Sequence, residues 1–480
     1  MNINAKPNTL YYGDCLEIMQ AFPDNWIDLI CLDPPFNSDE KYNAIFKGSG
    51  LQNIEPQVKA FDDTWNWNPQ VAERVEEVKS AIANPASKVI AAFETFIPRS
   101  KMLSYTSYMA ERLFQMWRIL RNTGSIYLHC DPYASHYLKL LMDAIFGEKN
   151  FRNEIVWCYT GPSNTKRWFP RKHQVILFYV KSDKDAFFNG NPIKIPYKKL
   201  KTGQTSGIFD EDFDLDPTGK IPEDYWLEDR DKMSPAGRKS NEYMGYKTQK
   251  PVALYERMIK ASSNEGDLVL DPFCGCGTTI DAALKNNRHA IGIDILPFAL
   301  RLINDRRLGV PLPVEGIPVC LETAEELAKM PKGSEKFQDW AISLVDGLAS
   351  NPKKVGDEGI DGFGMFAHTP TNMDKKGIIV QVTAASGSQN GKFDKLQTDV
   401  RKHNAAMGIL ITKDAQTAQN RWHVNLPHIE MNRTTYFPMQ CFSIEEYYRN
   451  GKRYQPPLNL PPLTNPWTGK PMQNTLFDPV

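Results

Sequence analysis

A buried strand that stops at a carboxylate and two prolines is the first feature of the sequence that could do chemistry. The apolar residues 29–32 are followed by Asp33, Pro34, Pro35 and Phe36. The Asp33 carboxylate and the Pro34 carbonyl are hydrogen-bond acceptors, and the proline rings fix the direction of the backbone. Phe36 adds a flat face on which a nucleobase can stack. The segment could therefore hold an exocyclic amine, whose two protons need two acceptors.

Such an amine is a poor nucleophile, because its lone pair is delocalised into the ring. Acceptors that draw its protons towards a tetrahedral arrangement localise the lone pair for attack on an electrophilic methyl group. This chemistry depends on orientation and charge stabilisation, and it needs neither a metal ion nor a covalent intermediate. The alternative for Asp33 alone is a carboxylate that caps a helix or faces solvent, but Pro-Pro-Phe after a buried strand favours the chemical role.

A second segment has the pattern of a nucleotide-binding turn. A predicted strand at residues 268–270 leads into Asp271, and Gly275 and Gly277 follow before a helix. Glycine permits a tight turn and a close ligand, and the helix N-terminus offers free N–H groups. Roughly 20 residues further on, a strand ends in Asp294, which could accept both hydroxyls of a ribose. The unit predicts an adenosine-containing cofactor, although the third glycine of the dinucleotide pattern is missing. A glycine-rich turn that binds nothing is the alternative.

Length and composition restrict the class of protein. The chain has 480 residues, which favours two or three domains, and 41% hydrophobic with 24% charged residues is typical of folded chains. Lys+Arg and Asp+Glu each number 57, so binding to nucleic acid would depend on local basic patches. The eight cysteines form no CxxC pair, and no zinc-ligand spacing is present. Without a signal-like N-terminus or an apolar run near the roughly 18 residues of a membrane span, we expect a cytoplasmic protein without membrane contact.

The elements that must position these residues alternate between strand and helix. Strands are predicted at residues 27–32, 125–131, 154–159 and 174–181, and helices at residues 104–124 and 133–147, each closed by a glycine. The alternation predicts an α/β fold with a doubly wound, mainly parallel sheet. The carboxyl ends of parallel strands share one edge, so Asp33 and Asp271 would belong to one site.

Together these motifs resemble the amino-group DNA methyltransferases that use S-adenosylmethionine. The order of the segments is similar to that of the beta class, in which the DPP[YF] segment precedes the cofactor segment. The resemblance covers approximately residues 10–308. It implies a Rossmann-like methyltransferase fold, S-adenosylmethionine as cofactor and double-stranded DNA as substrate, and it allows a homodimer.

The resemblance also implies roles for individual residues. Asp33, Pro34, Pro35 and Phe36 match the catalytic loop. The cofactor-binding positions would be Asp14 near the adenine, Thr248, Lys250 and Pro251 over the methionine end, Asp271, Phe273, Gly275 and Gly277 in the loop, and Asp294 at the ribose.

Two departures from the family pattern bear on the target base. The adenine-modifying members most often have Tyr at the position of Phe36, and the cytosine-N4 members usually have Ser at the position of Asp33. The presence of Asp33 favours methylation of adenine N6. Methylation of cytosine N4 is the alternative.

A basic run with aromatic residues lies between the two motifs. Residues 164–173 contain the candidate DNA contacts Lys166, Arg167, Trp168, Arg171 and Lys172. A solvated loop is the alternative. The family order places target recognition at residues 182–246, whose weak periodicity predicts an irregular insertion. The acidic run at residues 209–216 either faces away from DNA or accepts from cytosine amines.

The last third of the chain resembles a restriction-endonuclease-like module, which has an acid after a glycine-rich turn and then a strand ending in Gln/Glu-x-Lys. Asp361 and Gln381 match this pattern, Glu335 matches an upstream helix acid, and the three would form a degenerate metal site. Thr383 stands where the lysine is expected. We expect a module that binds DNA or a partner without cutting. A bifunctional restriction–modification protein with an active nuclease is the alternative.

The expected domain boundaries follow from these segments. Residues 1–181 form the catalytic part, 182–246 the recognition segment, 247–310 the cofactor-binding part and 311–330 a linker. Residues 331–450 form the smaller C-terminal α/β domain, and residues 451–480 a Pro-rich, poorly ordered tail.

Overall fold

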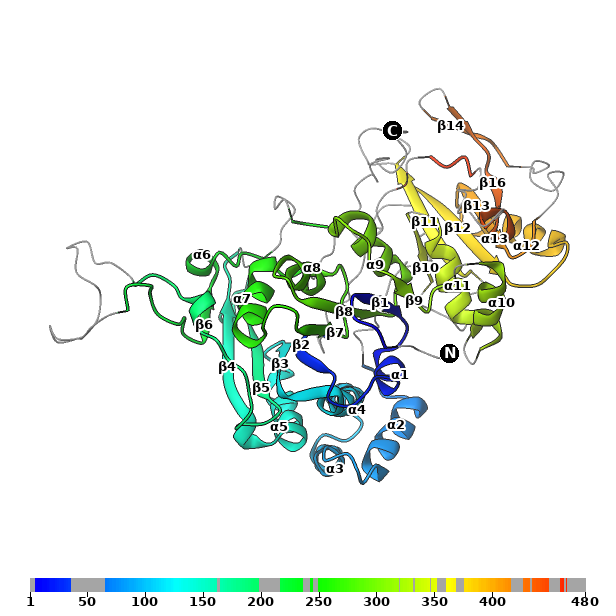
Figure 1. Cartoon of the computed structure of the whole chain (residues 1–480). Helices are drawn as coiled ribbons and strands as arrows, with labels where there is room; N and C mark the ends of the chain where they lie inside the picture. The colour runs from blue at the N-terminus through cyan, green and yellow to red at the C-terminus, as the bar shows by residue number, and fades with distance from the viewer. Residues whose placement is uncertain are drawn as a thin grey trace.

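The described residues form a nine-stranded sheet, a five-stranded sheet and a two-stranded sheet, and the two larger sheets organise the chain (Figure 1). The computed structural model describes residues 5–35, 65–161, 165–197, 216–235, 242–244, 249–318, 320–330, 333–345, 347–351, 360–367, 375–415, 426–431, 434–448, 458–461 and 463. Within these ranges no helix is long and apolar enough to cross a membrane.

The large sheet has nine strands in the order β6-β4-β5-β3-β2-β7-β8-β1-β9. The strands are β1 (Thr9–Tyr12), β2 (Ile27–Leu32), β3 (Leu120–Cys130), β4 (Phe151–Cys158), β5 (His173–Val180), β6 (Tyr225–Leu227), β7 (Leu268–Asp271), β8 (His289–Asp294) and β9 (Val314–Glu315). From β3 to β9 in this order, every neighbouring pair is parallel. Strand β5 is antiparallel to both β3 and β4. The predicted mainly parallel α/β sheet is therefore confirmed.

Helices cover both faces of this sheet (Figure 1). One face carries α1 (Cys15–Gln20), α2 (Pro69–Ser80), α3 (Ser87–Phe96), α4 (Lys101–Ile119) and α5 (Ser135–Phe146), and the other carries α7 (Val252–Ser262), α8 (Thr278–Lys285) and α9 (Pro297–Leu302). Along β2, Ile30 and Leu32 pack on the first face and Leu29 and Cys31 on the second. The chain leaves β2 towards β3 and leaves β7 towards β8, so the winding direction changes between β2 and β7. This is the position at which doubly wound sheets bind ligands.

The predicted helix at residues 104–124 extends too far. Helix α4 ends at Ile119, and β3 begins at Leu120 and runs through Gly124. A Cβ atom at Gly124 would lie 2.8 Å from the carbonyl oxygen of Asp28. The glycine is therefore required for the close approach of β3 to β2, and does not terminate the helix.

Residues 311–330, which the sequence predicts to be a linker, contain β9 and α10 (Leu321–Lys329). The backbone N–H of Leu10 donates to the carbonyl of Pro313 at 2.9 Å, and Leu10 lies opposite Val314 in the β1–β9 pairing. Strand β9 supplies the hydrogen-bond partners that the edge of β1 needs.

The C-terminal residues form a smaller α/β unit with a five-stranded sheet in the order β10-β11-β12-β13-β16. Its elements are β10 (Leu348–Ser350), β11 (Gly362–Ala367), β12 (Lys375–Thr383), β13 (Met407–Thr412) and β16 (Met439–Ser443), with α11 (Gly333–Ser343), α12 (Asn390–Lys402) and α13 (Ile444–Tyr447). Val380 packs with the residues of α11, and Ile379 packs with those of α12. The two helices therefore lie on opposite faces of this sheet. Other short elements are α6 (Glu228–Asp231), the antiparallel pair β14 (Ile429–Met431) and β15 (Thr434–Tyr436), and the short helical turns η1 (Glu148–Asn150), η2 (Asn191–Ile193) and η3 (Ile303–Arg307).

Part of the predicted disordered tail is packed. Asn459 and Gln440 exchange hydrogen bonds of 2.9 and 2.7 Å, and Leu463 is buried against Phe366. The leucines between the prolines cover the small sheet, because each buries apolar surface there.

Candidate functional site

The candidate site lies at the carboxyl ends of four adjacent strands, β2, β7, β8 and β1. Ile30 pairs with Leu270, Asp271 with Gly292, and Tyr12 with Asp294. The loops that carry Asp33, Asp271, Asp294 and Asp14 consequently leave the sheet side by side. The sequence-based expectation that distant segments share one edge is met.

Asp33 directly follows β2 and forms an ion pair with Lys250. The ammonium nitrogen Nζ of Lys250 donates to Oδ2 of Asp33 at 2.6 Å, and the two side chains are only 7% and 17% exposed. The other oxygen, Oδ1, is buried and accepts no hydrogen bond from any described residue. Pro34 is buried and Pro35 half-buried. One carboxylate oxygen is thus paired with Lys250, while the other is buried and has no donor among the described residues.

A buried histidine lies near this ion pair without adding charge to it. His129, near the end of β3, is 2% exposed, and its Nε2 lies 2.6 Å from Oε1 of Gln174. Burial, and then the positive charge of Lys250, lower the pKa of His129 to about 3. The ring is neutral at physiological pH, so Lys250 supplies the positive charge beside Asp33.

Asp271 ends β7 and holds the start of the glycine-rich loop. One of its oxygens accepts from the N–H of Phe273 at 3.0 Å. Burial raises the pKa of Asp271 to about 7, and the negative charges of Asp33 and Asp294 contribute in the same direction. A further negative charge at this edge is therefore unfavourable, and a ligand with positive charge is favoured.

The two glycines of this loop are required by its geometry. Gly275 and Gly277 have φ angles of +47° and +75°, in the left-handed region. A Cβ atom at Gly277 would lie 2.6 Å from Cγ1 of Ile303. Gly277 immediately precedes α8, so the loop delivers the chain to a helix N-terminus at the site.

Asp294 ends β8 and faces the same loop. Its two oxygens accept from the N–H groups of Gly275 and Leu296, each at 2.8 Å. Burial raises the pKa of Asp294 to about 6, while these N–H groups oppose the rise. Each carboxylate oxygen retains acceptor capacity, so the residue can also receive hydroxyl donors.

Asp14 lies next to Asp294, since the N–H of Gly13 donates to the Asp294 carbonyl at 3.0 Å. The guanidinium Nη2 of Arg112 lies 2.8 and 2.6 Å from the two oxygens of Asp14, and Arg112 also stacks at 3.4 Å from the ring centroid of Tyr108. The sequence interpretation missed Arg112. Its signal was an arginine four residues after Tyr108 on the buried stripe of a helix, where a carboxylate partner is required.

Other predicted cofactor residues are only partly described. Phe36 and Thr248 lie outside the described residues. Pro251 directly precedes α7, and Phe273 is partly buried against the core beneath α4.

The predicted DNA-binding run forms the connection from β4 to β5. Lys166, Arg167, Trp168 and Arg171 are exposed and Lys172 is half-buried. The guanidinium of Arg171 hydrogen-bonds to the Tyr133 hydroxyl and stacks 4.3 Å from that ring centroid. The described parts of the predicted recognition segment are residues 182–197, 216–235 and 242–244, and they include β6, which extends the large sheet beside β4.

The residues of the predicted degenerate metal site are not all brought together. Oδ2 of Asp361 accepts from the N–H of Val382 at 2.6 Å, while the Gln381 amide donates to Asp399 on α12 at 2.8 Å. Glu335 lies on α11, on the opposite face of the sheet from α12. Among the described residues, no group of three or more His, Cys, Asp or Glu could hold a metal ion.

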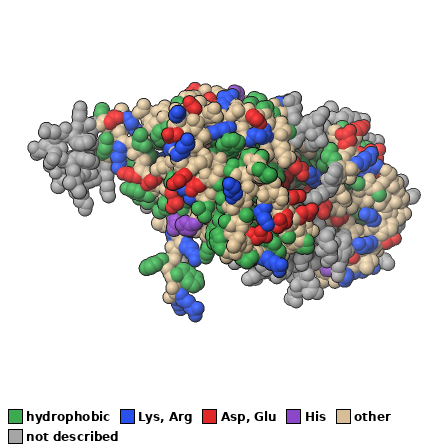
Figure 2. All heavy atoms as spheres, turned by 90° about the horizontal axis from the view of Figure 1, so that it is seen from below, with side chains coloured by type: hydrophobic (Ala, Val, Ile, Leu, Met, Phe, Trp, Pro, Cys, Tyr) green, Lys and Arg blue, Asp and Glu red, His purple; other side chains and the backbone are tan. Residues whose placement is uncertain are grey.

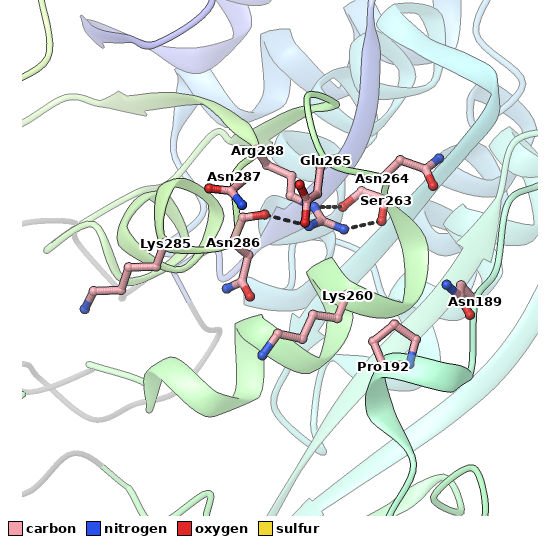
Figure 3. A pocket seen from close by; sticks show the side chains of 10 residues that line it. All are labelled: Asn189, Pro192, Lys260, Ser263, Asn264, Glu265, Lys285, Asn286, Asn287 and Arg288. Atoms are coloured by element: carbon pink, nitrogen blue, oxygen red, sulfur yellow. Dashed lines mark hydrogen bonds between the residues drawn. The ribbon is translucent and has the colours of Figure 1, made fainter. Parts of the chain in front are cut away.

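A separate pocket of about 430 Å³ lies where α7 and α8 end (Figure 3). Its lining includes Ser263, Asn286 and Arg288, which precede the starts of β7 and β8. The Arg288 guanidinium donates to the carbonyl oxygens of Ser263 and Asn286 at 2.5 and 2.6 Å. This pocket is at the amino edge of the sheet and does not belong to the site of Asp33.

Comparison with known proteins identifies relatives for the large-sheet domain. The family model described as DNA methylase, of the N6/N4 type, matches residues 27–305. The DNA adenine methyltransferase YhdJ of Escherichia coli (strain K12) is 30% identical over 330 residues, which cover 68% of this chain and 87% of the relative. The type II methyltransferase M.HpaI of Haemophilus parainfluenzae is 27% identical over 297 residues, 62% of this chain and 73% of the relative. The structure of PvuII DNA methyltransferase (cytosine-N4-specific) aligns with 64% of this chain and 90% of its own, at 14% identity and a TM-score of 0.40.

Proposed function

Because this chain belongs to the N6/N4 family of DNA methylases and uses S-adenosylmethionine, we propose that it methylates N6 of adenine in double-stranded DNA. The observation that carries the amine chemistry is the buried Oδ1 atom of Asp33, which accepts no hydrogen bond from any described residue. The choice of adenine over cytosine follows from the residue type, because the cytosine-N4 members usually have Ser at the position of Asp33. A buried acceptor without a donor is costly, and an exocyclic amine would supply the donor. The motif order further supports assignment to the beta class.

The chain's own residues fit the cofactor. Gly275 and Gly277 let a ligand approach the backbone at the start of α8, and Asp294 can accept the ribose hydroxyls. Asp14, fixed by Arg112, lies beside Asp294 where the adenine would be expected. When bound, S-adenosylmethionine supplies an electrophilic methyl group and a positive charge, which suits an edge lined by carboxylates.

Asp33 and Pro34 then act on the amine. One N–H of the amine donates to Oδ1 of Asp33 and the other to the carbonyl of Pro34, which localises the nitrogen lone pair. Lys250 fixes the rotation of the carboxylate through Oδ2, so that Oδ1 is the atom presented to the base. After transfer, the nitrogen carries an extra proton with its positive charge. Asp33 is the base positioned to accept that proton.

Nucleoside analysis tests this proposal. The purified protein would be incubated with S-adenosylmethionine and unmethylated genomic DNA, and the digested nucleosides separated by mass spectrometry. We expect N6-methyl-2′-deoxyadenosine as the product, and none with Asp33→Ala. Asp24→Ala is the matched control, since Asp24 is an exposed carboxylate that pairs with Arg118. N4-methylcytosine would instead favour the alternative suggested by Phe36.

The relatives suggest the cellular setting. M.HpaI is a type II methyltransferase, and we propose that this chain likewise acts in restriction–modification. A cytoplasmic location, where bacterial DNA is accessible, is part of the same proposal.

For the C-terminal unit we propose a nuclease-like module that binds without cutting. Its sheet, with α11 and α12 on opposite faces, supports the resemblance, and Asp361 lies beside β12 as the pattern requires. Thr383, at the position expected for lysine, is buried and accepts from the N–H of Ala385 at 3.2 Å. A hydroxyl held in this way is a poor substitute for the lysine cation.

A further inference from the structure

Two neighbouring aromatic side chains in the β4–β5 connection are left in solvent. Trp168 is 61% exposed and Phe169 is 93% exposed. An aromatic ring stabilises a fold or an interface most when it is buried, because its burial removes a large apolar area from water. No ring contact joins either side chain to another described residue. Two exposed aromatic side chains side by side in the sequence are typical of a surface that binds a partner.

Three contacts hold the described residues of this connection in place. At its base, the N–H of Tyr159 donates to the Lys172 carbonyl at 3.0 Å and extends the β4–β5 ladder. Near its tip, the Thr165 hydroxyl donates to the Trp168 carbonyl at 2.8 Å. Arg171 is stacked on Tyr133, at the start of α5. The aromatic rings are therefore held away from the core by a braced loop.

The loop rises from the catalytic edge of the large sheet. Strand β5 is antiparallel to β3, with Val175 opposite Cys130, so the start of β5 lies at the edge where β2 ends at Asp33. The aromatic pair and Asp33 consequently face substrate from the same side. Figure 2 shows a narrow projection of hydrophobic and Lys/Arg side chains standing clear of the body.

Positive charge surrounds the aromatic pair. Lys166 and Arg167 precede it, and Arg171 and Lys172 follow it. Cations in these positions could bind the phosphates that flank a base step, and a flat ring between them could insert between the stacked base pairs. The charge pattern thus favours duplex DNA as the occupant.

We propose that Phe169 inserts into the base stack of the duplex and fills the space left when the target base leaves for Asp33. This inference rests on the proposed function and assigns a positioning role, because the rings would not touch the reacting amine. Residues 165–172 are already held by the contacts given above, so this part of the connection needs little further ordering when DNA binds.

The experiment uses the full chain and a DNA duplex. The duplex contains the sequence that the chain methylates, which is first determined by sequencing modified bases in a host that expresses it. With 2-aminopurine in place of the target base, the wild-type protein should raise the fluorescence as the base is unstacked. Phe169→Ala should reduce this rise and lower the methylation rate of the normal duplex by about tenfold or more, the scale of losing part of the unstacking energy. Ile82→Ala is the matched control, because Ile82 is 95% exposed on the α2–α3 connection.

A second substrate, a duplex with a mismatch at the target base, distinguishes a role in unstacking the base from a general role in DNA binding. A mismatched base opposite the target weakens its stacking and pairing, so on this duplex Phe169→Ala should recover towards the wild-type rate. Equal rates for both proteins on the matched duplex would overturn the proposal. An equal loss on matched and mismatched duplexes would also overturn it, and would indicate a general docking or protein-contact role. A wild-type chain that methylates neither duplex would instead refute the proposed function, and with it the proposed insertion of Phe169.

Discussion

The ammonium nitrogen of Lys250 lies 2.6 Å from Oδ2 of Asp33, although the two residues are 217 positions apart in the chain. The pair joins the segment before α7 to the end of β2, and it leaves Oδ1 of Asp33 without a donor among the described residues. The carboxylate that we propose to be catalytic is therefore oriented by Lys250. Preorganisation of this kind is the main way in which a fixed charge lowers a barrier.

Asp33→Ala should reduce methyl transfer by about 10²–10⁴-fold, the usual contribution of a positioned acid–base group. Binding of S-adenosylmethionine, measured by calorimetry, should be unchanged, because Asp33 is expected to touch the amine and not the nucleoside. A loss of cofactor affinity that parallels the loss of activity would point to a structural role for Asp33.

Lys250→Met should lower the single-turnover rate by about 10- to 150-fold, because a hydrogen bond to a charged group contributes about 1.5–3 kcal/mol. The dissociation constant for S-adenosylmethionine should change much less. Lys250→Arg, which keeps the charge, should restore part of the rate. If cofactor affinity falls as far as the rate does, Lys250 acts on the methionine end of the cofactor, as the family resemblance implies, and not on Asp33.

Cofactor affinity should depend on pH through Asp294. Burial raises the pKa of this carboxyl to about 6, and the ionised form is the one that accepts two hydroxyl donors. Binding therefore favours deprotonation, and the affinity should increase as the pH rises through about 6 and weaken below it. Titrations between pH 5 and pH 8 with wild type and Asp294→Asn would test this. The variant should bind more weakly at pH 8 and show a flatter profile, whereas an identical profile would place the cofactor elsewhere.

Replacing Lys166, Arg167, Arg171 and Lys172 by Ala should weaken DNA binding and flatten its salt dependence. Each phosphate contact that is lost should reduce the slope of log K against log salt by about 0.9. Lys149→Ala is a suitable control, because this residue lies in the turn after α5, at the opposite edge of the sheet from Asp33. A slope equal to that of the wild type would show that the run is only solvated.

The C-terminal unit should not cut DNA. With magnesium or manganese, unmethylated DNA should remain intact on a gel, because Thr383 cannot supply the positive charge that hydrolysis needs. Metal-dependent cutting that disappears in Asp361→Ala would make the chain a bifunctional restriction–modification protein.

The sequence predicts the large sheet and the positions of its acids well, because strand ends, glycines and capping residues are local signals. Asp33, Asp271 and Asp294 each follow a short apolar run, and parallel strands place all three at one edge. The ion pair of Lys250 with Asp33, and that of Arg112 with Asp14, depend on tertiary packing between distant segments. No spacing in a single chain encodes either pair.

The ends of helices and strands were less predictable, because they too depend on contacts between distant segments. Gly124 reads as a helix stop in the sequence, but its role is set by the carbonyl of Asp28 on the neighbouring strand. Residues 311–330 are rich in proline at their start, yet two of them complete the edge of the sheet as β9. The domain limits, the roles of Phe36 and Thr248 and a homodimer stay predictions.

Sequencing that detects modified bases directly, in a host that lacks adenine methylation and expresses either the wild-type chain or Asp33→Ala, tests the central claim most directly. The account predicts N6-methyladenine in one recurring sequence context with the wild type, and no methylation with Asp33→Ala although both proteins are present at equal levels. N4-methylcytosine in the wild-type host, or the same adenine methylation with Asp33→Ala, would contradict it.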